Sequence, residues 1–132
     1  MIPSETQECL AFVDWCKLVR FRGEPLYERV VKIPNERGKR SVLTAILTAL
    51  GMRKGFPDYL LLCPTREHGA LFIEAKRMGE SADRDQLEWE ERLKRFGYYA
   101  TIAAGSLQMI SAVRQYMAKF ARAGEWEDRV TL

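Results

Sequence analysis

The chain has 132 residues, of which 47% are apolar and 30% charged, a balance typical of a single globular domain with its own core. No apolar run approaches the roughly 18 residues that a membrane-spanning helix needs, and the first residues lack the basic and apolar regions of a signal peptide. We therefore expect one domain over residues 1–132, with its core at about 4–120, working in the cytoplasm without a membrane.

The first half of the chain is predicted to contain two helices and one strand. Ser4 is a suitable N-cap, and apolar residues follow at i, i+3, i+4 and i+7, which predicts a helix over 4–19. A β-branched run predicts a strand over 26–33, and a polar, basic loop follows over 35–41. Apolar residues at helical spacing predict a second helix over 42–50, which ends at Gly51.

The second half is predicted to begin with a β-hairpin. Its strands are 59–63 and the run that starts at Leu71, joined by a turn over 64–69. A helix over 83–96, a strand over 98–103 and a helix over 107–120 follow, and 121–132 is interpreted as a tail. The order α-β-α-β-β-α-β-α predicts an α/β fold, with a central mixed sheet flanked by helices that bury their apolar faces on it.

Cysteine and histidine usage argues against a zinc site. The three cysteines, Cys9, Cys16 and Cys63, form no C-x-x-C pair and lie in apolar runs, where a free cysteine behaves as a small buried hydrophobe. The single histidine, His68, lies in the predicted hairpin turn. The sequence therefore favours neither zinc nor a nuclease that uses a histidine base.

Positive charge is concentrated in one part of the chain. Residues 17–54 contain ten Lys or Arg and three Glu, although the whole chain carries a net charge of only +3. A basic block of this kind suits a phosphate backbone, but many such blocks are simply solvated surface. Nucleic-acid binding is one interpretation of this feature.

Two acidic residues and a lysine stand out in the predicted hairpin. Asp58 begins the first strand, while Glu74 and Lys76 lie two residues apart on the second and project from one face. Because the start of one strand lies near the end of its antiparallel partner, we expect Asp58 to approach Glu74 and Lys76. The alternative is that Glu74 and Lys76 form a surface ion pair and Asp58 caps a turn.

Phosphodiester hydrolysis is the chemistry that suits this group. The carboxylates of Asp58 and Glu74, with the backbone carbonyl of Ala75, offer hard oxygen ligands for Mg²⁺ or Mn²⁺. Such a cation neutralises phosphate charge and activates a water for in-line attack. Lys76 is then suited to positioning that water or stabilising the developing negative charge.

The surrounding motifs resemble those of the PD-(D/E)xK nuclease core. Gly-Phe-Pro-Asp at 55–58 leads into an apolar strand, and Glu-Ala-Lys at 74–76 closes the next one. With Ile-Pro-Asn at 33–35 upstream and Asp-Gln-Leu-Glu-Trp at 85–89 downstream, the pattern over about 4–120 is most similar to the VRR-NUC branch in its short, stand-alone phage or prophage form.

That resemblance implies a role for several side chains. Asp58 and Glu74 would be metal ligands, Lys76 the catalytic lysine, and Gln86 the glutamine of the helix after the core. Gln86 shares a helix face with Trp89 and Leu93, so it is either a site residue or a polar residue at the edge of that face. The family also takes a metal ligand from the first helix. Glu8 is our choice and Glu5 the fallback, although either acid also suits a helix start.

The resemblance also implies contacts with DNA. Asn35, Lys39 and Arg40 match the family's basic loop and are predicted to touch the backbone near the cut. The cations that flank the proposed metal site, Arg53, Lys54 and Arg77, are predicted to add phosphate contacts. The chain departs from the family pattern at Tyr59, where leucine is common, and at Cys9, where glutamine is frequent, and neither is a proposed ligand.

The resemblance implies a metal-dependent endonuclease that acts on branched DNA as a homodimer, as a Holliday-junction resolvase does, because two-fold symmetry suits a four-way junction. One alternative is a flap or nicking nuclease with the same site. The other is a DNA-binding or partner-protein module without catalysis, which the intact Asp58, Glu74 and Lys76 argue against.

Overall fold

The computed structural model describes residues 2–34 and 41–131. Its helices are α1 (Glu5–Cys16), the 3-10 helix η1 (Leu26–Arg29), α2 (Val42–Ala49), α3 (Arg84–Arg95) and α4 (Ser106–Phe120). Its strands are β1 (Arg20–Phe21), β2 (Glu24–Pro25), β3 (Val30–Lys32), β4 (Tyr59–Leu61), β5 (Leu71–Lys76), β6 (Tyr99–Ala104) and β7 (Trp126–Glu127).

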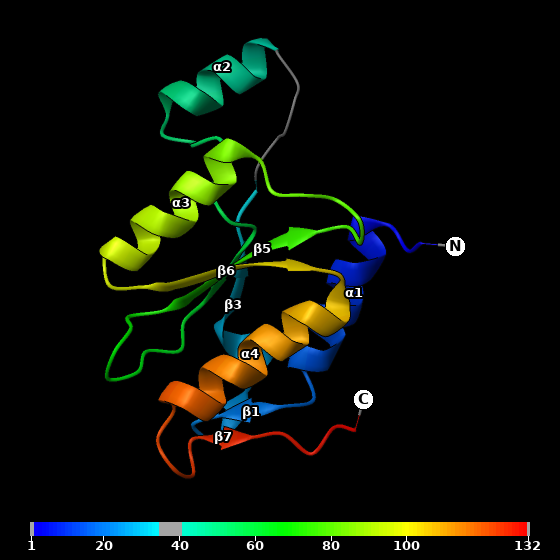
Figure 1. Ribbon diagram of the computed structural model, residues 1–132, viewed down its shortest axis with the longest axis vertical. Helices are drawn as coiled ribbons and strands as arrows, with labels where there is room; N and C mark the ends of the chain where they lie inside the picture. Colours follow the sequence, from blue (N-terminus) through cyan, green and yellow to red (C-terminus); the bar gives the residue numbers. More distant parts are fainter. Residues whose placement is uncertain (1, 35–40, 132) are drawn as a thin grey trace.

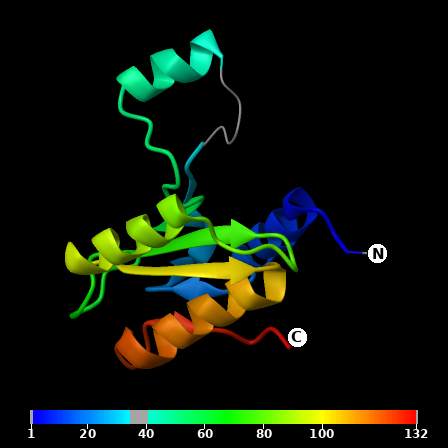
Figure 2. The same ribbon diagram turned by 45° about the horizontal axis from the view of Figure 1, so that its top comes forward.

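The central sheet has four strands in the order β3-β4-β5-β6. The pairs β3–β4 and β4–β5 are antiparallel, and β5–β6 is parallel, because α3 forms a crossover between those two strands. Helix α3 covers one face of the sheet, and α1 and α4 cover the other (Figures 1 and 2). The predicted α/β class, with a mixed sheet flanked by helices, is confirmed.

Two apolar clusters hold these layers together. The larger one lies between the sheet and the pair α1–α4, where Phe12, Leu71, Ile73 and Tyr116 are among the residues fully or almost fully buried. The smaller one lies under α3, where Leu93 packs near Phe72 and Ala100. The sheet is therefore buried on both faces, which explains why every residue of β5 is buried rather than every second one.

Two predicted elements differ from the structure. The strand predicted over 26–33 is a 3-10 helix over Leu26–Arg29 followed by the short strand Val30–Lys32, because the β-branched residues that suggested a strand begin only at Val30. The segment 121–132, interpreted as a tail, contributes β7. This strand pairs with β1 and completes a second, three-stranded sheet in the order β2-β1-β7.

Helix α2 was expected to bury its apolar face on the sheet, and that expectation was wrong. None of its residues, all of which are described, is buried, and Val42 and Leu50 are each 79% exposed. The helix stands away from the rest of the molecule in both ribbon views (Figures 1 and 2). Helical periodicity predicts an apolar face, but it does not say what covers that face.

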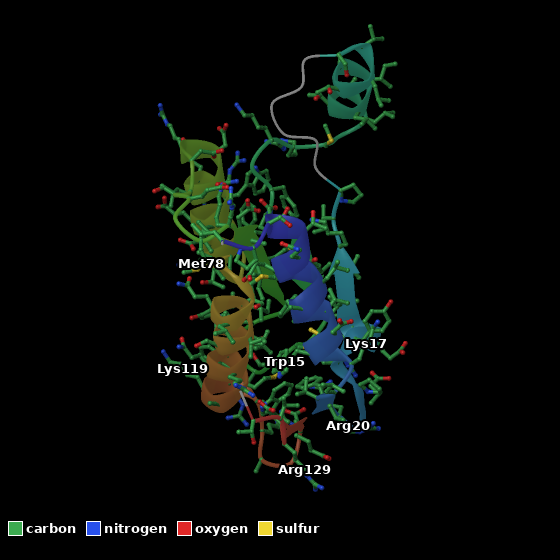
Figure 3. The ribbon with its side chains drawn as sticks, turned by 90° about the vertical axis from the view of Figure 1, so that its right-hand side faces the viewer. Trp15, Lys17, Arg20, Met78, Lys119 and Arg129 are labelled. Carbon is green, nitrogen blue, oxygen red and sulfur yellow. The ribbon has the colours of Figure 1, made fainter. Side chains whose placement is uncertain are left out.

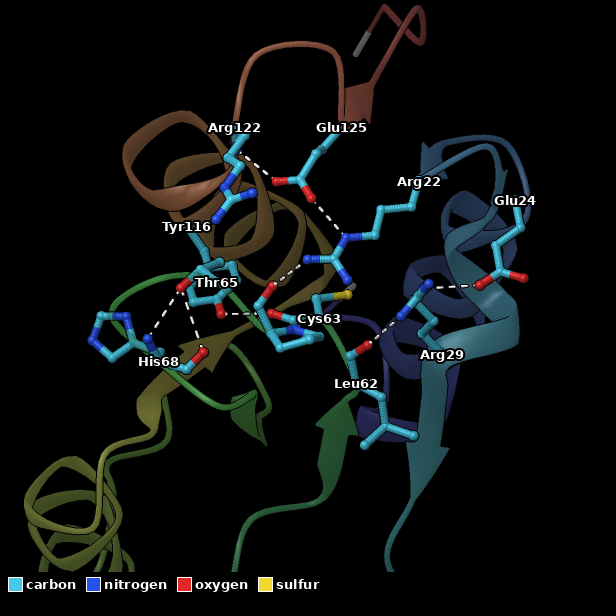
Figure 4. A network of polar contacts seen from close by, with 11 residues as sticks. Arg22, Glu24, Arg29, Leu62, Cys63, Thr65, His68, Tyr116, Arg122 and Glu125 are labelled. Atoms are coloured by element: carbon cyan, nitrogen blue, oxygen red, sulfur yellow. Dashed lines mark hydrogen bonds and ion pairs between the residues drawn. The ribbon is translucent and has the colours of Figure 1, made fainter.

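A polar network fixes the end of β4 that leads into the hairpin turn (Figure 4). Tyr116 donates to the carbonyl of Cys63 at 2.7 Å, Arg29 donates to the carbonyl of Leu62 at 2.9 Å, and Arg22 donates to that of Pro64 at 3.2 Å. These bonds satisfy carbonyls that the sheet leaves unpaired. Among the described residues, no helix is both long and apolar enough to cross a membrane.

Candidate active site

The β4–β5 hairpin brings Asp58 beside the end of β5. Tyr59 pairs with Ile73, so residues 74–76 extend past the β4 register and face the segment that precedes it. There the backbone N–H of Ala75 donates to Asp58 Oδ2 at 2.8 Å. Asp58 is therefore adjacent to the strand segment that carries Glu74 and Lys76.

All three charged residues of this group are buried. Asp58 is 3% exposed, Glu74 2% and Lys76 6%. Burying charged groups is costly unless they are paired, hydrogen-bonded or bound to a metal. This degree of burial rules out the alternative in which Glu74 and Lys76 form a solvated surface pair.

Gln86 holds Glu74 in place from α3. Its Nε2 donates to Glu74 Oε2 at 2.5 Å, and its Oε1 accepts from the backbone N–H of Asp83 at 3.0 Å. Asp83 is the N-cap of α3, and its side chain accepts from the backbone N–H of Gln86 at 2.9 Å, which completes a capping box. The amide that reaches the carboxylate is thereby fixed in orientation by the start of its own helix.

Gly55 allows α3 to approach the segment before β4. Its φ is +82°, and a Cβ built there would lie 2.6 Å from Asp85 Cβ and 2.9 Å from the backbone N of Gln86. Only glycine adopts this conformation and fits this space without strain. The glycine of the Gly-Phe-Pro-Asp motif therefore sets the distance between the Asp58 segment and the helix that carries Gln86.

Lys32 is a charged neighbour of this site that sequence reasoning missed. Its Nζ lies 3.2 Å from Asp58 Oδ1 and 5.0 Å from the centre of the Tyr59 ring. Lys32 pairs with Tyr59 in the β3–β4 ladder, and the next residue, Ile33, donates its N–H to the carbonyl of Asp58 at 2.7 Å. The feature that could have identified Lys32 is the antiparallel pairing of β3 with β4, because it places the end of β3 beside the start of β4.

Cys9 and Tyr59 border the same region in their neutral forms. Burial raises the pKa of the Cys9 thiol, and burial likewise raises the pKa of the Tyr59 hydroxyl well above its usual range, while the two side chains hydrogen-bond each other. A neutral thiol is a poor ligand for hard cations. Of the remaining cysteines, Cys16 and Cys63 are buried and free, as expected of core residues.

The two candidate acids of α1 occupy different surroundings. The Glu8 carboxylate accepts a hydrogen bond from the backbone N–H of Ser106, the first residue of α4, where a negative charge is favoured by the helix dipole. Glu5 lines a hollow together with Cys9, Lys32 and Tyr59, on the side of the sheet where Lys32 meets Asp58. The assignment of a helix-1 ligand stays a prediction.

The residues predicted to contact DNA lie in three parts of the chain. Asn35, Lys39 and Arg40 lie outside the described residues. Arg53 lies 5.0 Å from the centre of the Trp89 ring, and Lys54 pairs with Asp85 at 3.4 Å, next to Gln86. Arg77 is exposed and directly follows β5.

The residues present fit a hard divalent cation. Within the described parts of the chain, no three His, Cys, Asp or Glu side chains are grouped so as to hold a metal by themselves. Asp58 and Glu74 nevertheless place two buried carboxylates around Ala75, at a strand end. Mg²⁺ is usually held in this way, by one or two carboxylates together with waters and substrate phosphates rather than by an all-protein cage.

A protein of known structure described as a "VRR_NUC domain protein" has the same fold. The two superpose with a TM-score of 0.78 at 26% sequence identity, over 89% of this chain and 91% of the other. No family model matches this sequence, and no curated protein matches it. The likeness therefore spans nearly the whole of both chains.

Proposed function

We propose that this chain, which is a VRR-NUC domain of the PD-(D/E)xK nuclease type, hydrolyses DNA phosphodiester bonds with Mg²⁺ or Mn²⁺. The observation that supports this most is the buried pair of acids, Asp58 directly before β4 and Glu74 on its antiparallel partner β5, with Lys76 two residues beyond Glu74 and buried with it. Charged side chains are almost never fully buried unless they are paired or bind a metal, so a buried cluster of this kind indicates a functional site.

Each residue of the cluster has a distinct part in the proposed reaction. A bound divalent cation supplies Lewis-acid chemistry, which neutralises phosphate charge and lowers the pKa of a water. Asp58 and Glu74, helped by the Ala75 carbonyl, are its ligands. Gln86 keeps the Glu74 carboxylate in one orientation through the 2.5 Å bond. Lys76 provides a positive charge in a site of low solvent access, where it stabilises the charge that develops on the phosphate.

The flanking cations are proposed to follow the DNA backbone toward this centre. Lys54 pairs with Asp85 in the first turn of α3, which also carries Gln86, and Arg53 lies over the Trp89 ring in the following turn. Arg77 directly follows β5. The sequence assigns the same task to Asn35, Lys39 and Arg40. Contacts of this kind position the duplex without reading its sequence, which suits an enzyme that selects DNA by shape.

Branched DNA is the substrate that we propose. The test is cleavage of labelled four-way, flap, duplex and single-stranded DNA under identical conditions with Mg²⁺ or Mn²⁺, with EDTA as the metal-free control. We expect the four-way junction to be cut fastest and EDTA to abolish the reaction. Equal cleavage rates on the linear duplex and the four-way junction would contradict selectivity for branched DNA. Fastest cleavage of the flap would show that the enzyme is a flap nuclease and not a junction resolvase.

We also propose that two copies associate through α2. The helix and its flanks, residues 41–52, carry no charged side chain, and Leu43 and Ile46 are 53% and 51% exposed. Beside α2 lies a hollow of about 460 Å³ whose lining includes Ile33, Leu47, Met52 and Phe56. An apolar helix next to an apolar hollow is self-complementary, so a two-fold axis would place each helix against the other copy's hollow.

An isolated helix of eight residues has little stability in water, which is a second reason to expect that a partner covers α2. Sedimentation equilibrium of the parent should show a dimer at micromolar concentration. Ile46→Glu should give a folded monomer, while the control Leu87→Glu, on α3 and also 51% exposed, should remain dimeric. A monomeric parent, or a dimer unaffected by Ile46→Glu, would rule out this interface.

A further inference from the structure

Lys32 brings a second lysine to the active site, and it differs from Lys76 in being accessible. The Lys32 side chain is 52% exposed, whereas the Asp58 side chain that it contacts is only 5% exposed. The 3.2 Å ion pair therefore joins a buried carboxylate to a cation at the mouth of the site. Lys32 also borders a hollow of about 480 Å³ next to Tyr59 and α1, which leaves its long side chain room to move.

We propose that Lys32 neutralises Asp58 in the metal-free protein and turns to a DNA phosphate when a divalent cation binds Asp58. This inference rests on the proposed nuclease function. The ammonium group and a hard cation compete for one carboxylate, because both carry positive charge and both require its oxygen atoms. Once displaced, the ammonium lies within a side-chain length of the proposed cut, where a phosphate is its natural partner.

Loss of the Lys32 charge should change the affinities for metal and for DNA in opposite directions. Removing the positive charge of Lys32 relieves its repulsion of a cation at Asp58, so metal affinity should rise. The same change removes one phosphate contact, so DNA affinity should fall. A lysine with a purely structural role would not separate these two affinities, since a distorted Asp58 would hold the metal less well and so weaken the DNA binding that the metal supports.

The chain contains a closely matched control. Lys17 is 53% exposed, pairs with Asp14 at 3.8 Å and lies 5.1 Å from the centre of the Tyr27 ring. It follows α1, and Figure 3 shows it at the end of that helix, lower in the view than Met78, which follows β5. Lys17→Met therefore removes a lysine with the same kind of partners outside the site.

The first experiment is Mn²⁺ titration by calorimetry in the absence of DNA. We expect Lys32→Met to bind Mn²⁺ about tenfold more tightly than the parent, and Lys17→Met to match the parent. Unchanged or weaker binding by a folded Lys32→Met would overturn the role of Lys32 while leaving the nuclease proposal intact. If the parent binds no Mn²⁺ even when the titration is repeated with DNA present, both proposals fail.

The second experiment measures DNA affinity against salt concentration with Ca²⁺ in place of Mn²⁺. Lys32→Met should bind DNA more weakly, and the slope of log affinity on log salt should fall by about one relative to the parent. Lys17→Met should leave the slope unchanged. A slope equal to the parent's in Lys32→Met would show that Lys32 makes no phosphate contact.

Discussion

Gln86 shows how one side chain can serve both folding and a site. Its carbonyl caps the start of α3 and its amide bonds the buried carboxylate of Glu74. A hydrogen bond to a buried charged group contributes more than one between neutral groups, because the charged acceptor is costly to leave with fewer donors. The helix start and the site are therefore mutually stabilising.

Replacement of Gln86 by Met tests this double role. Met keeps the length of the side chain but removes the donor to Glu74 and the acceptor for Asp83, so we expect a loss of about 2–3 kcal/mol in the free energy of unfolding. Urea denaturation measures it. Leu87→Met, a neighbouring exposed position, is the control and should change stability by less than about 0.5 kcal/mol. A similarly small loss for Gln86→Met would contradict the account.

At the scale of the elements, stability depends on the close packing of α3 against Gly55. Gly55→Ala should destabilise the protein by about 3 kcal/mol, since it adds a clash with Asp85 to the strain of a left-handed backbone. Gly79 has a similar φ, +89°, but nothing within 4 Å of a built Cβ, so Gly79→Ala should cost only about 1 kcal/mol. Thermal unfolding compares the two. Equal losses would show that the close approach does not matter.

The C-terminal strand is held by an ion pair with α4. Arg114 donates to the Asp128 carboxylate, which also accepts from the backbone N–H of Val130. Burial opposes ionisation of Asp128, but the bonds from Arg114 and Val130 outweigh it and hold the pKa below its usual 3.8. A carboxyl whose pKa is lowered in the folded state stabilises the protein above its unfolded pKa. That stability is lost as the pH falls through the folded value.

Asp128→Asn should therefore lower the melting temperature at pH 7 by a few degrees. The difference between variant and parent should begin to shrink as the pH falls below about 4, where the unfolded carboxyl becomes protonated, and should disappear once the pH falls through the lower pKa of the folded protein. Melting curves from pH 7 to pH 3 provide the measurement. A difference that stays constant over this range would show that the charge of Asp128 does not hold the strand.

For the whole molecule, the sequence predicts what depends on local pattern. Capping residues and apolar spacing predict the four α-helices, and the hairpin motif predicts that Asp58 lies next to the strand of Glu74 and Lys76. Three two-residue strands were missed: β1 and β2 form a hairpin too short to show an alternating pattern, and β7 is defined only by pairing with β1 across the chain. Lys32 was missed for the same reason, since its partner Asp58 lies 26 residues away.

The exposed face of α2 could not have been predicted from periodicity either. Its apolar pattern equals that of a buried helix, and only the tertiary structure shows that its own chain leaves Val42 and Leu50 uncovered. The same argument applies to the site. Motif spacing indicates which residues meet, while the burial that makes their charges costly follows from the layers of helices on both faces of the sheet.

The most direct test of a metal-dependent nuclease is the rate of Mn²⁺-dependent cleavage of labelled four-way DNA by the parent and by Lys76→Met. Circular dichroism and thermal unfolding must first show that the variant is folded. We predict cutting by the parent that EDTA abolishes, and a rate at least about 100-fold lower in the variant. A folded parent that cuts no DNA with Mg²⁺ or Mn²⁺, or a variant that cuts as fast as the parent, would contradict the assignment.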